Sequence, residues 1–581
     1  MFFKNQLIVA ITTIIYIYIY QTNYIDIWLN FFFFICFLNV TSYWNILYLG
    51  KKGFFYLNII YLGFFVLYTN YVFYYILLTN TYVYFDFFNF YYFEDNSPLT
   101  FSLYIDFYNY SYINLTATIG WTAYCYAYGY MRGEVFLEKF LFLLLSFLYS
   151  MIFLLLANNF VILLIGWELI GITSYFLINF WITKISTFKA AFKAFIFNRL
   201  SDINIIIILI FFYNFYNNMT LNNDVWVINY NLFYYYHINI FLFNGYDLMI
   251  VFIVISSSCK SAQFGFHIWL PDSMEAPVPA SALIHSATLV SAGIYLINKL
   301  WFIIILSNYF YYIFILLSSW TAFYGALISI YQTDLKRILA YSTISHCGIL
   351  MFLSIFNNVY LLILYLYVHG FFKSLSFMCV GNIIKNSFNL QDYRFMGQKI
   401  QTNKYEYFFL TFSLMNLSGY GLSIGFFAKH FIIINFYFIN FFYFICTAIL
   451  GFFYTFFILN YVFFSFKKYN FNSTYVYSTS YATSSPIFQI GCITILTFQS
   501  FLLILYVLSF IYCLKFSELQ LNYSVNISYN NSFIFFQKHL FVSYINFTLL
   551  IFFFLFLKFI LFRNFLFSFN FIYLFIYLAF F

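Results

Sequence analysis

The chain has 581 residues, of which 65% are hydrophobic and only 7% are charged. Soluble domains use roughly 25% charged residues, so this composition excludes a soluble globular protein and predicts a polytopic membrane protein. The net charge of +8 is small for this length and the basic residues are scattered. Nucleic acid is therefore not an implied partner, whereas membrane lipids are.

Phe and Tyr are unusually common, with 93 and 62 residues. Their codons are AT-rich and the residues are spread evenly, which indicates Leu replacement in an AT-rich organelle genome. The eight cysteines never form a CxxC pair and lie mostly in apolar runs, so we expect buried free thiols and no metal site. The chain also lacks a phosphate-binding loop and a dinucleotide fingerprint, so we expect no bound cofactor.

The first hundred residues predict membrane helices and contain no candidate site residue. Residues 1–20 lack the Arg-rich character of a transit peptide, which favours a retained first helix. Apolar runs follow at 28–40 and 54–78, and the second is long enough to span a bilayer. A polar patch at 94–98 closes this section, and we assign 1–105 to N-terminal transmembrane helices.

From Asp106 the pattern becomes regular, and we assign 106–468 to an antiporter-like core. Apolar segments alternate with short polar joints, as packed antiparallel helices require. The predicted helices are 107–130, 136–156, 158–181, one from about 188, 309–331, 335–356, 359–383 and 442–464. Polar stretches at 217–247 and 384–406 are expected to be loops.

Residues 469–581 are assigned to C-terminal helices. An apolar run at 487–513 is followed by a polar stretch at 514–535 and two further apolar runs. The fold expected for the whole chain is all-α, with about 15 to 16 transmembrane helices.

The stretch 256–300 concentrates the unusual chemistry. It places Lys260, His267 and His285 in apolar segments and holds three of the five prolines of the chain. A lysine in a bilayer costs roughly 2.5 to 3.5 kcal/mol on insertion scales, so such residues mark pathways by default. The alternative is a lysine that reaches the interface, with prolines marking a loop. Lys260 and His267 are seven residues apart, hence on one helical face, which favours a polar cavity.

Two carboxylates and an arginine precede this stretch. Glu168 lies in G-W-E-L-I-G, a run with no other charge, and is a functional candidate or else a protonated, hydrogen-bonded acid. Arg199 and Asp202, three residues apart, share one helical face and predict an ion pair. A purely structural pair and a functional one are equally compatible with that spacing.

Two later segments carry further ionisable groups. His369 and Lys373 are spaced i and i+4 in H-G-F-F-K, close enough to share a chain of waters. Lys429 ends the run S-G-Y-G-L-S-I-G-F-F-A-K, whose glycines and serines predict a broken helix. By contrast, Asp334, Lys336 and Arg337 are expected at a membrane surface.

The run K-S-A-Q-x-G-x-H-x-W-L-P-D-x-M-E-x-P-x-P-x-S-A-L-I-H resembles the signature of the antiporter-like membrane subunits of respiratory complex I. The form with H-x-W-L-P and S-A-L-I-H looks most like the subunit 5 branch of that family. The resemblance implies two inverted repeats with helices broken near Lys260 and Lys429, and a C-terminal lateral arm that is shortened here. It also implies a coupling role for Arg199 and Asp202 beside a neighbouring subunit, so we rank Asp202 as a functional candidate below Glu168.

Four positions depart from the family pattern. Tyr365 stands where relatives often have a histidine, and Gly421 and His430 replace the family's proline and acidic residue. His346 stands where the family usually has glutamine, so we assign it no transfer role. The charge balance of Lys429 must then come from another group.

The resemblance implies a proton-translocating membrane subunit of NADH:ubiquinone oxidoreductase in the mitochondrial inner membrane. Lys260 is then the central proton carrier, Glu168 its modulator and Lys429 the exit group. His267, His285, His369 and Lys373 serve as relays. NADH, FMN, iron–sulfur clusters and ubiquinone are expected in partner subunits, and the adjacent partner is the antiporter-like subunit 4. The alternatives are the large subunit of a multi-subunit sodium/proton antiporter and a structural scaffold, which needs no buried ionisable groups.

Overall fold

The computed structural model describes ten stretches of the chain. They are residues 46–79, 83–92, 98–216, 245–304, 308–356, 358–387, 389–397, 404–420, 423–435 and 437–465. The expected C-terminal helices and arm, residues 1–20 and Gly421 lie outside these described residues.

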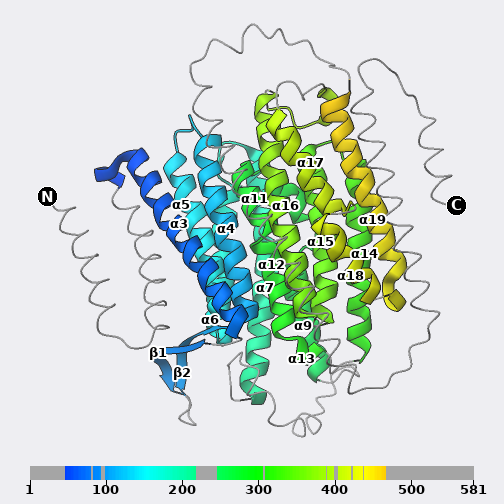
Figure 1. Cartoon of the computed structure of the whole chain (residues 1–581). Helices are drawn as coiled ribbons and strands as arrows, with labels where there is room; N and C mark the ends of the chain where they lie inside the picture. The colour runs from blue at the N-terminus through cyan, green and yellow to red at the C-terminus, as the bar shows by residue number, and fades with distance from the viewer. Residues whose placement is uncertain are drawn as a thin grey trace.

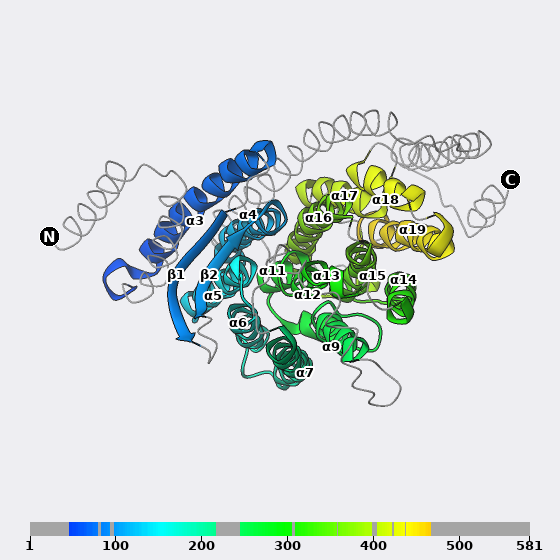
Figure 2. The same cartoon turned by 90° about the horizontal axis from the view of Figure 1, so that it is seen from below.

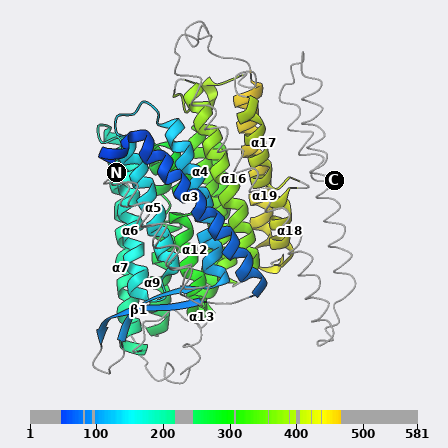
Figure 3. The same ribbon diagram turned by 60° about the vertical axis from the view of Figure 1, so that its left-hand side comes forward.

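Five long helices form the first part of the bundle, on the left and in the centre of Figure 1. They are α3 (Ile46–Thr79), α4 (Phe107–Tyr130), α5 (Leu137–Leu156), α6 (Phe160–Ile178) and α7 (Ile185–Tyr216). Each of α4 to α7 packs on the helix before it, and the joints between α4, α5, α6 and α7 are short. Helix α3 packs on α4 and crosses the outside of the bundle obliquely (Figure 3).

Short helices fill the centre of the molecule. They are α9 (Gly245–Lys260), α10 (Trp269–Asp272), the 3₁₀ turn η2 (Ser273–Glu275), α11 (Val278–Ser286), α12 (Leu289–Lys299) and α13 (Trp301–Ile304). Seen along the bundle, α11 and α12 lie between the two groups of long helices (Figure 2). The segment Val278–Lys299 is apolar enough to span a membrane, yet its side chains are buried inside protein.

The remaining helices close the other side of the bundle. They are α14 (Asn308–Tyr331), α15 (Leu335–Ile355), α16 (Val359–Asn386), η3 (Tyr393–Phe395), α17 (Lys404–Ser418), α18 (Ile424–Asn435), α19 (Tyr437–Leu459) and the π-helical turn η4 (Asn460–Phe464). Helix α16 is the hub of this group, since it contacts α4, α11, α15, α17 and α18.

The architecture confirms an all-α polytopic membrane protein. Eight described segments have the length and apolar composition to cross a membrane. Helices α4 and α7, with 24 and 32 residues, also exceed the roughly 20 residues that a bilayer requires. The predicted helix boundaries hold within a few residues from α4 to α16. The two expected loops end earlier than predicted, because Gly245–Asp247 begin α9 and Lys404–Glu406 begin α17.

One element was not predicted. Strands β1 (Val83–Tyr92) and β2 (Pro98–Ile105) form an antiparallel hairpin at the lower end of the bundle in Figure 1. Aromatic residues favour strands, and the polar patch 94–98 connects the two. In a chain so rich in Phe and Tyr, this signal is hard to distinguish from that of a membrane helix.

The chain is interrupted beside both lysines, as predicted. Helix α9 ends at Lys260, and Ala262 and Gly265 follow with φ of 53° and 90°. Helix α17 ends at Ser418, Gly419 has φ of 82°, and α18 then carries Lys429. The inverted relation of two repeats and the division at 106 and 468 stay predictions.

Candidate functional site

Lys260 lies at the centre of the described bundle. It is the last residue of α9 and is 1% exposed. Its Nζ donates to the carbonyl oxygen of Trp167 at 3.3 Å and lies 5.2 Å from the centroid of that indole ring. The indole is fixed in turn, because its N–H donates to Ser201 Oγ at 2.7 Å. Helices α6, α7 and α9 therefore meet at this ammonium group.

Small residues allow the helices to approach this closely. A Cβ added at Gly293 of α12 would lie 2.4 Å from the carbonyl oxygen of Ser257, so α12 packs directly on the last turn of α9. Gly171 of α6 faces Lys260, and a Cβ there would lie 3.5 Å from Nζ. The second glycine of G-W-E-L-I-G thus leaves space around the amine.

Arg199 lies between the two carboxylates of the site. Its Nη1 is 3.3 Å from Asp202 Oδ2, which is the expected i, i+3 ion pair, and 3.8 Å from Glu168 Oε1. The Asp202 side chain is 4% exposed, whereas those of Glu168 and Arg199 are each 37% exposed. Both carboxylates interact electrostatically with Lys260, Asp202 more strongly than Glu168. Asp202, which we ranked below Glu168, therefore also acts on Lys260 and is the more buried of the two carboxylates.

Helix α7 also holds the linker of residues 261–277, which joins α9 to α11. Lys193 pairs with Asp272 of α10, and Ser186 Oγ donates to Glu275 Oε2 at 3.2 Å. The same helix therefore interacts electrostatically with Lys260 through Asp202 and holds the linker through Lys193.

The two histidines of the central stretch differ in their surroundings. His267 lies in the linker, partly buried, with its ring 5.1 Å from that of Tyr324. His285 is fully buried near the end of α11, and its Nε2 lies 3.0 Å from Ser273 Oγ. Its Nδ1 has no hydrogen-bond partner among the described residues. His285 is thus placed inside the bundle and His267 near its boundary.

Helices α15 and α16 bring four polar side chains together. Lys373 Nζ donates to Ser342 Oγ at 2.6 Å, and both residues are fully buried. One turn away, the rings of His346 and His369 lie 5.5 Å apart. His346 is 4% exposed and His369 is 2% exposed, so neither faces lipid.

Lys429 binds the end of the broken helix. Its Nζ donates to the carbonyl oxygens of Leu417 at 2.6 Å and Ser418 at 3.1 Å, the last two residues of α17. The carbonyl end of a helix carries a partial negative charge. That end supplies the charge balance that the next residue, His430, cannot give.

The three buried lysines that the sequence singled out as site residues share one property. Within the described part of the chain, no carboxylate lies within 4 Å of Nζ of Lys260, Lys373 or Lys429. Each amine has only neutral oxygen acceptors at hydrogen-bond distance. A buried ammonium without a close counter-charge is weakly stabilised, so small electrostatic changes can move its proton.

Two further lysines are buried that we did not expect to be buried from the sequence. Lys336 was expected at a membrane surface with Asp334 and Arg337, but it is 5% exposed. Its Nζ lies 3.3 Å from the carbonyl oxygens of Met274 and Ala276, so it holds the linker before α11. Lys299 was not singled out at all. It is 7% exposed, and the sequence signal was a lone lysine at the end of an apolar run.

A family model described as NADH:quinone oxidoreductase/Mrp antiporter, TM, matches residues 157–457. The chain belongs to this family. The match begins just before α6 and ends within α19, so it contains every lysine and histidine named above as a candidate. The predicted resemblance is confirmed.

Curated relatives carry the same family's names. NADH-ubiquinone oxidoreductase chain 5 of Paramecium tetraurelia is 46% identical over 374 residues, which are 61% of this chain and 63% of that relative. This chain covers 46% to 50% of the length of seven further relatives with that name. It thus spans less than two thirds of the curated relatives that it matches.

Two solved structures share the fold. A chain of the membrane-bound sulfane sulfur reductase, an archaeal respiratory membrane complex, gives a TM-score of 0.64 at 15% identity, covering 81% of this chain and 94% of that chain. A chain of the Mrp complex from Dietzia sp. gives 0.60 at 20% identity, covering 74% and 46%. At 15% and 20% identity, these two structures show a similarity of fold alone.

Proposed function

We propose that this chain is a proton-translocating membrane subunit of a respiratory NADH:ubiquinone oxidoreductase, equivalent to chain 5 of its curated relatives. One observation carries the proposal. Three lysine side chains are buried in the bundle and have only neutral acceptors at hydrogen-bond distance. Lys260 and Lys429 lie at helix interruptions, and Lys373 lies where α16 packs on α15. A scaffold gains nothing from three such groups, because each raises the free energy of the membrane-embedded fold.

Lys260 is the central proton carrier in this proposal. Asp202 and Glu168 favour its ammonium form, and Arg199 draws both carboxylates toward itself. A shift of Arg199 toward or away from these carboxylates changes how strongly they stabilise the ammonium. The proton is then held when the carboxylates act on Lys260 and released when they are neutralised.

Beyond Lys260, the route continues through the centre of the bundle. His285 and His369 belong to α11 and α16, which pack against each other, and Lys373 follows one turn after His369. Lys429 at the break between α17 and α18 is the exit group. His267 lies at the boundary of the bundle, so we place it at the end of a side branch.

The energy for this transfer comes from other subunits. Moving one proton against the membrane potential costs roughly 2.3 kcal/mol per 100 mV. We assign NADH, FMN, iron–sulfur clusters and ubiquinone to partner subunits. Coupling to them is conformational or electrostatic, and this chain's contribution is the set of proton-binding groups.

The outer face of α6 and α7 supports a partner subunit at this position. Glu168 and Arg199 are each 37% exposed on it, although they lie among apolar side chains. The exposed apolar residues of the two helices include Ile165, Leu169, Phe192, Ile196, Leu200 and Ile203. Charged groups facing lipid are costly, so we propose that the adjacent antiporter-like subunit, subunit 4, covers this face. The multi-pass chain then resides in the mitochondrial inner membrane.

The alternative is the large subunit of a sodium/proton antiporter of the Mrp type. The likeness to the Dietzia Mrp complex favours it, with a TM-score of 0.60. At 20% identity this likeness concerns the fold, whereas the 46% identical relative is a chain 5. Copurification separates the two functions: a flavin- and iron–sulfur-containing NADH dehydrogenase in the same particle supports our proposal.

Lys260→Met tests the proposed carrier. Methionine keeps a similar volume and removes an expensive charge, so we expect normal assembly. Proton pumping and coupled NADH oxidation by the reconstituted complex should fall together. Glu168→Gln should lower both more mildly, because Asp202 still acts on Lys260. Normal pumping by the Lys260→Met complex would refute the assignment.

A further inference from the structure

His346 of α15 faces two proton-binding residues on the neighbouring helix. Its Nδ1 lies 2.6 Å from the hydroxyl oxygen of Tyr365, and its ring lies 5.5 Å from that of His369. Tyr365 and His369 are four residues apart on α16, so His346 inserts between consecutive turns of that helix. All three side chains are buried.

The next turn repeats this arrangement. Ser342 precedes His346 by four residues on α15, and Lys373 follows His369 by four on α16. Ser342 Oγ accepts from Lys373 Nζ at 2.6 Å. The two helices thus present a ladder of facing polar groups, in which His346 is the member from α15 that can bind and release a proton.

His346 is also within electrostatic range of the third helix of the site. It interacts electrostatically with Lys429 of α18, with Lys373 and with His369. Lys429 is held by carbonyl oxygens of α17, and α18 packs on α16. His346 is therefore within electrostatic range of ionisable groups on both α16 and α18.

We propose that His346 is a proton-transfer residue that connects His369 and Lys373 to Lys429. The neutral imidazole accepts one proton at Nδ1, from α16 through the Tyr365 hydroxyl, and passes its Nε2 proton to the neutral amine of Lys429, so no other reactant is needed. Tyr365 orients the ring. Its hydroxyl donates to Nδ1 when the imidazole is neutral and accepts from Nδ1 when the imidazole is protonated.

The test uses the full chain in its assembled, reconstituted complex, and the inference rests on the proposed function. His346→Gln keeps a polar group of similar size beside Tyr365 but cannot carry a proton. We expect normal assembly and an initial pumping rate lowered at least about five-fold. Thr343→Val is the matched control, since it removes a buried hydroxyl of α15 that bonds only the Ala340 carbonyl oxygen of its own helix, and should leave pumping unchanged.

A double variant supplies the second readout. In His346→Gln combined with Tyr365→His, the facing helix returns an imidazole to nearly the same place, because the two original side chains are in contact. We expect this variant to recover at least about half of the pumping rate, which a structural role would not produce.

Each outcome bears on the inference. Wild-type pumping by His346→Gln, with Lys260→Met impaired in the same assay, overturns the role of His346 and leaves the proposed function intact. Normal pumping by both variants overturns the proposed function itself. If His346→Gln does not assemble, His346→Asn replaces it, and failure of both to assemble makes His346 structural and overturns the inference.

Discussion

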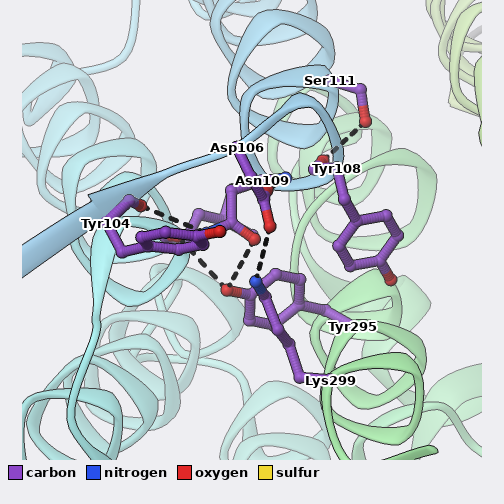
Figure 4. A network of polar contacts seen from close by, with 8 residues as sticks. Tyr104, Asp106, Tyr108, Asn109, Ser111, Tyr295 and Lys299 are labelled. Carbon is purple, nitrogen blue, oxygen red and sulfur yellow. Dashed lines mark hydrogen bonds and ion pairs between the residues drawn. The ribbon is translucent and has the colours of Figure 1, made fainter. Parts of the chain in front are cut away.

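Lys299 and Lys260 are two buried lysines, each the last residue of its helix, and they differ in their partners. Lys299 Nζ lies 3.0 Å from Asp106 Oδ2 and within 6.0 Å of the ring centroids of Tyr104, Tyr108 and Tyr295 (Figure 4). Lys260 Nζ has one carbonyl acceptor at 3.3 Å and one aromatic ring.

The groups around Lys299 are tied to one another as well. Asp106 Oδ1 accepts from the backbone N–H of Asn109 at 2.6 Å and caps α4. The Tyr295 hydroxyl lies 3.1 Å from Asn109 Oδ1 (Figure 4). A satisfied network of this kind holds one arrangement, here α4 against α12.

The contrast gives a criterion that separates a buried lysine with a structural role from one with a functional role. A lysine with a carboxylate and several fixed partners has one strongly preferred protonation state. A lysine with neutral acceptors and carboxylates beyond 4 Å can change state when its surroundings move. Lys299 therefore stabilises the fold, whereas the surroundings of Lys260 fit the carrier role given to it in the proposed function.

Lys299→Met should have the largest effect on the protein. It leaves the carboxylate of Asp106, whose side chain is 21% exposed, without its counter-charge. Breaking such a pair costs about 2 to 4 kcal/mol, so we expect a strong loss of folded, assembled chain. The amount of intact complex and its thermal stability in detergent measure this. Asp106→Asn added to Lys299→Met should restore part of the loss, and a stable single variant would remove the contrast with Lys260.

Asp202→Asn should have the next largest effect, on pumping and not on assembly. Asparagine keeps the shape but ends the stronger of the two carboxylate interactions with Lys260. At an effective dielectric near 20, such an interaction is worth about 1 to 2 kcal/mol at roughly 10 Å. The pumping rate of the reconstituted complex should fall further than in Glu168→Gln. The reverse order would return the role of modulator to Glu168.

The sequence predicted the helices and the interruptions because their signals are local. Apolar runs with polar joints define α4 to α7, and glycines and serines mark the break before Lys429. The hairpin was missed because aromatic density masks the alternation that distinguishes a strand. Lys336 was placed at a surface because two further charged residues, Asp334 and Arg337, lie beside it in the sequence.

Pairings between distant residues are outside what a single sequence can predict. Asp106 and Lys299 are 193 residues apart, and only the packing of α4 beside α12 brings them together. His346 and Tyr365 were each noted as departures from the family pattern, yet nothing in the sequence indicated that they touch. Asp202 was ranked below Glu168 because helical spacing predicts its pairing with Arg199 but not its burial near Lys260.

Gly171→Ala should give the smallest effect and test whether space around Lys260 matters. The added methyl would lie 3.5 Å from Lys260 Nζ and 3.7 Å from Asn198 Cβ, which are ordinary contacts, so the fold should accept it. Alanine also favours a helix by about 1 kcal/mol relative to glycine.

The methyl group would nevertheless fill the space beside the amine with apolar atoms and make the ammonium harder to form. We expect normal assembly and a pumping rate lowered about two-fold in the reconstituted complex. Gly63→Ala of α3 is the matched control, because its methyl would meet only the Trp121 ring at 3.6 Å and should leave pumping unchanged. Equal pumping by the two variants would mean that Lys260 exchanges its proton without access to the space that Gly171 leaves open, and that Trp167 and Asp202 suffice.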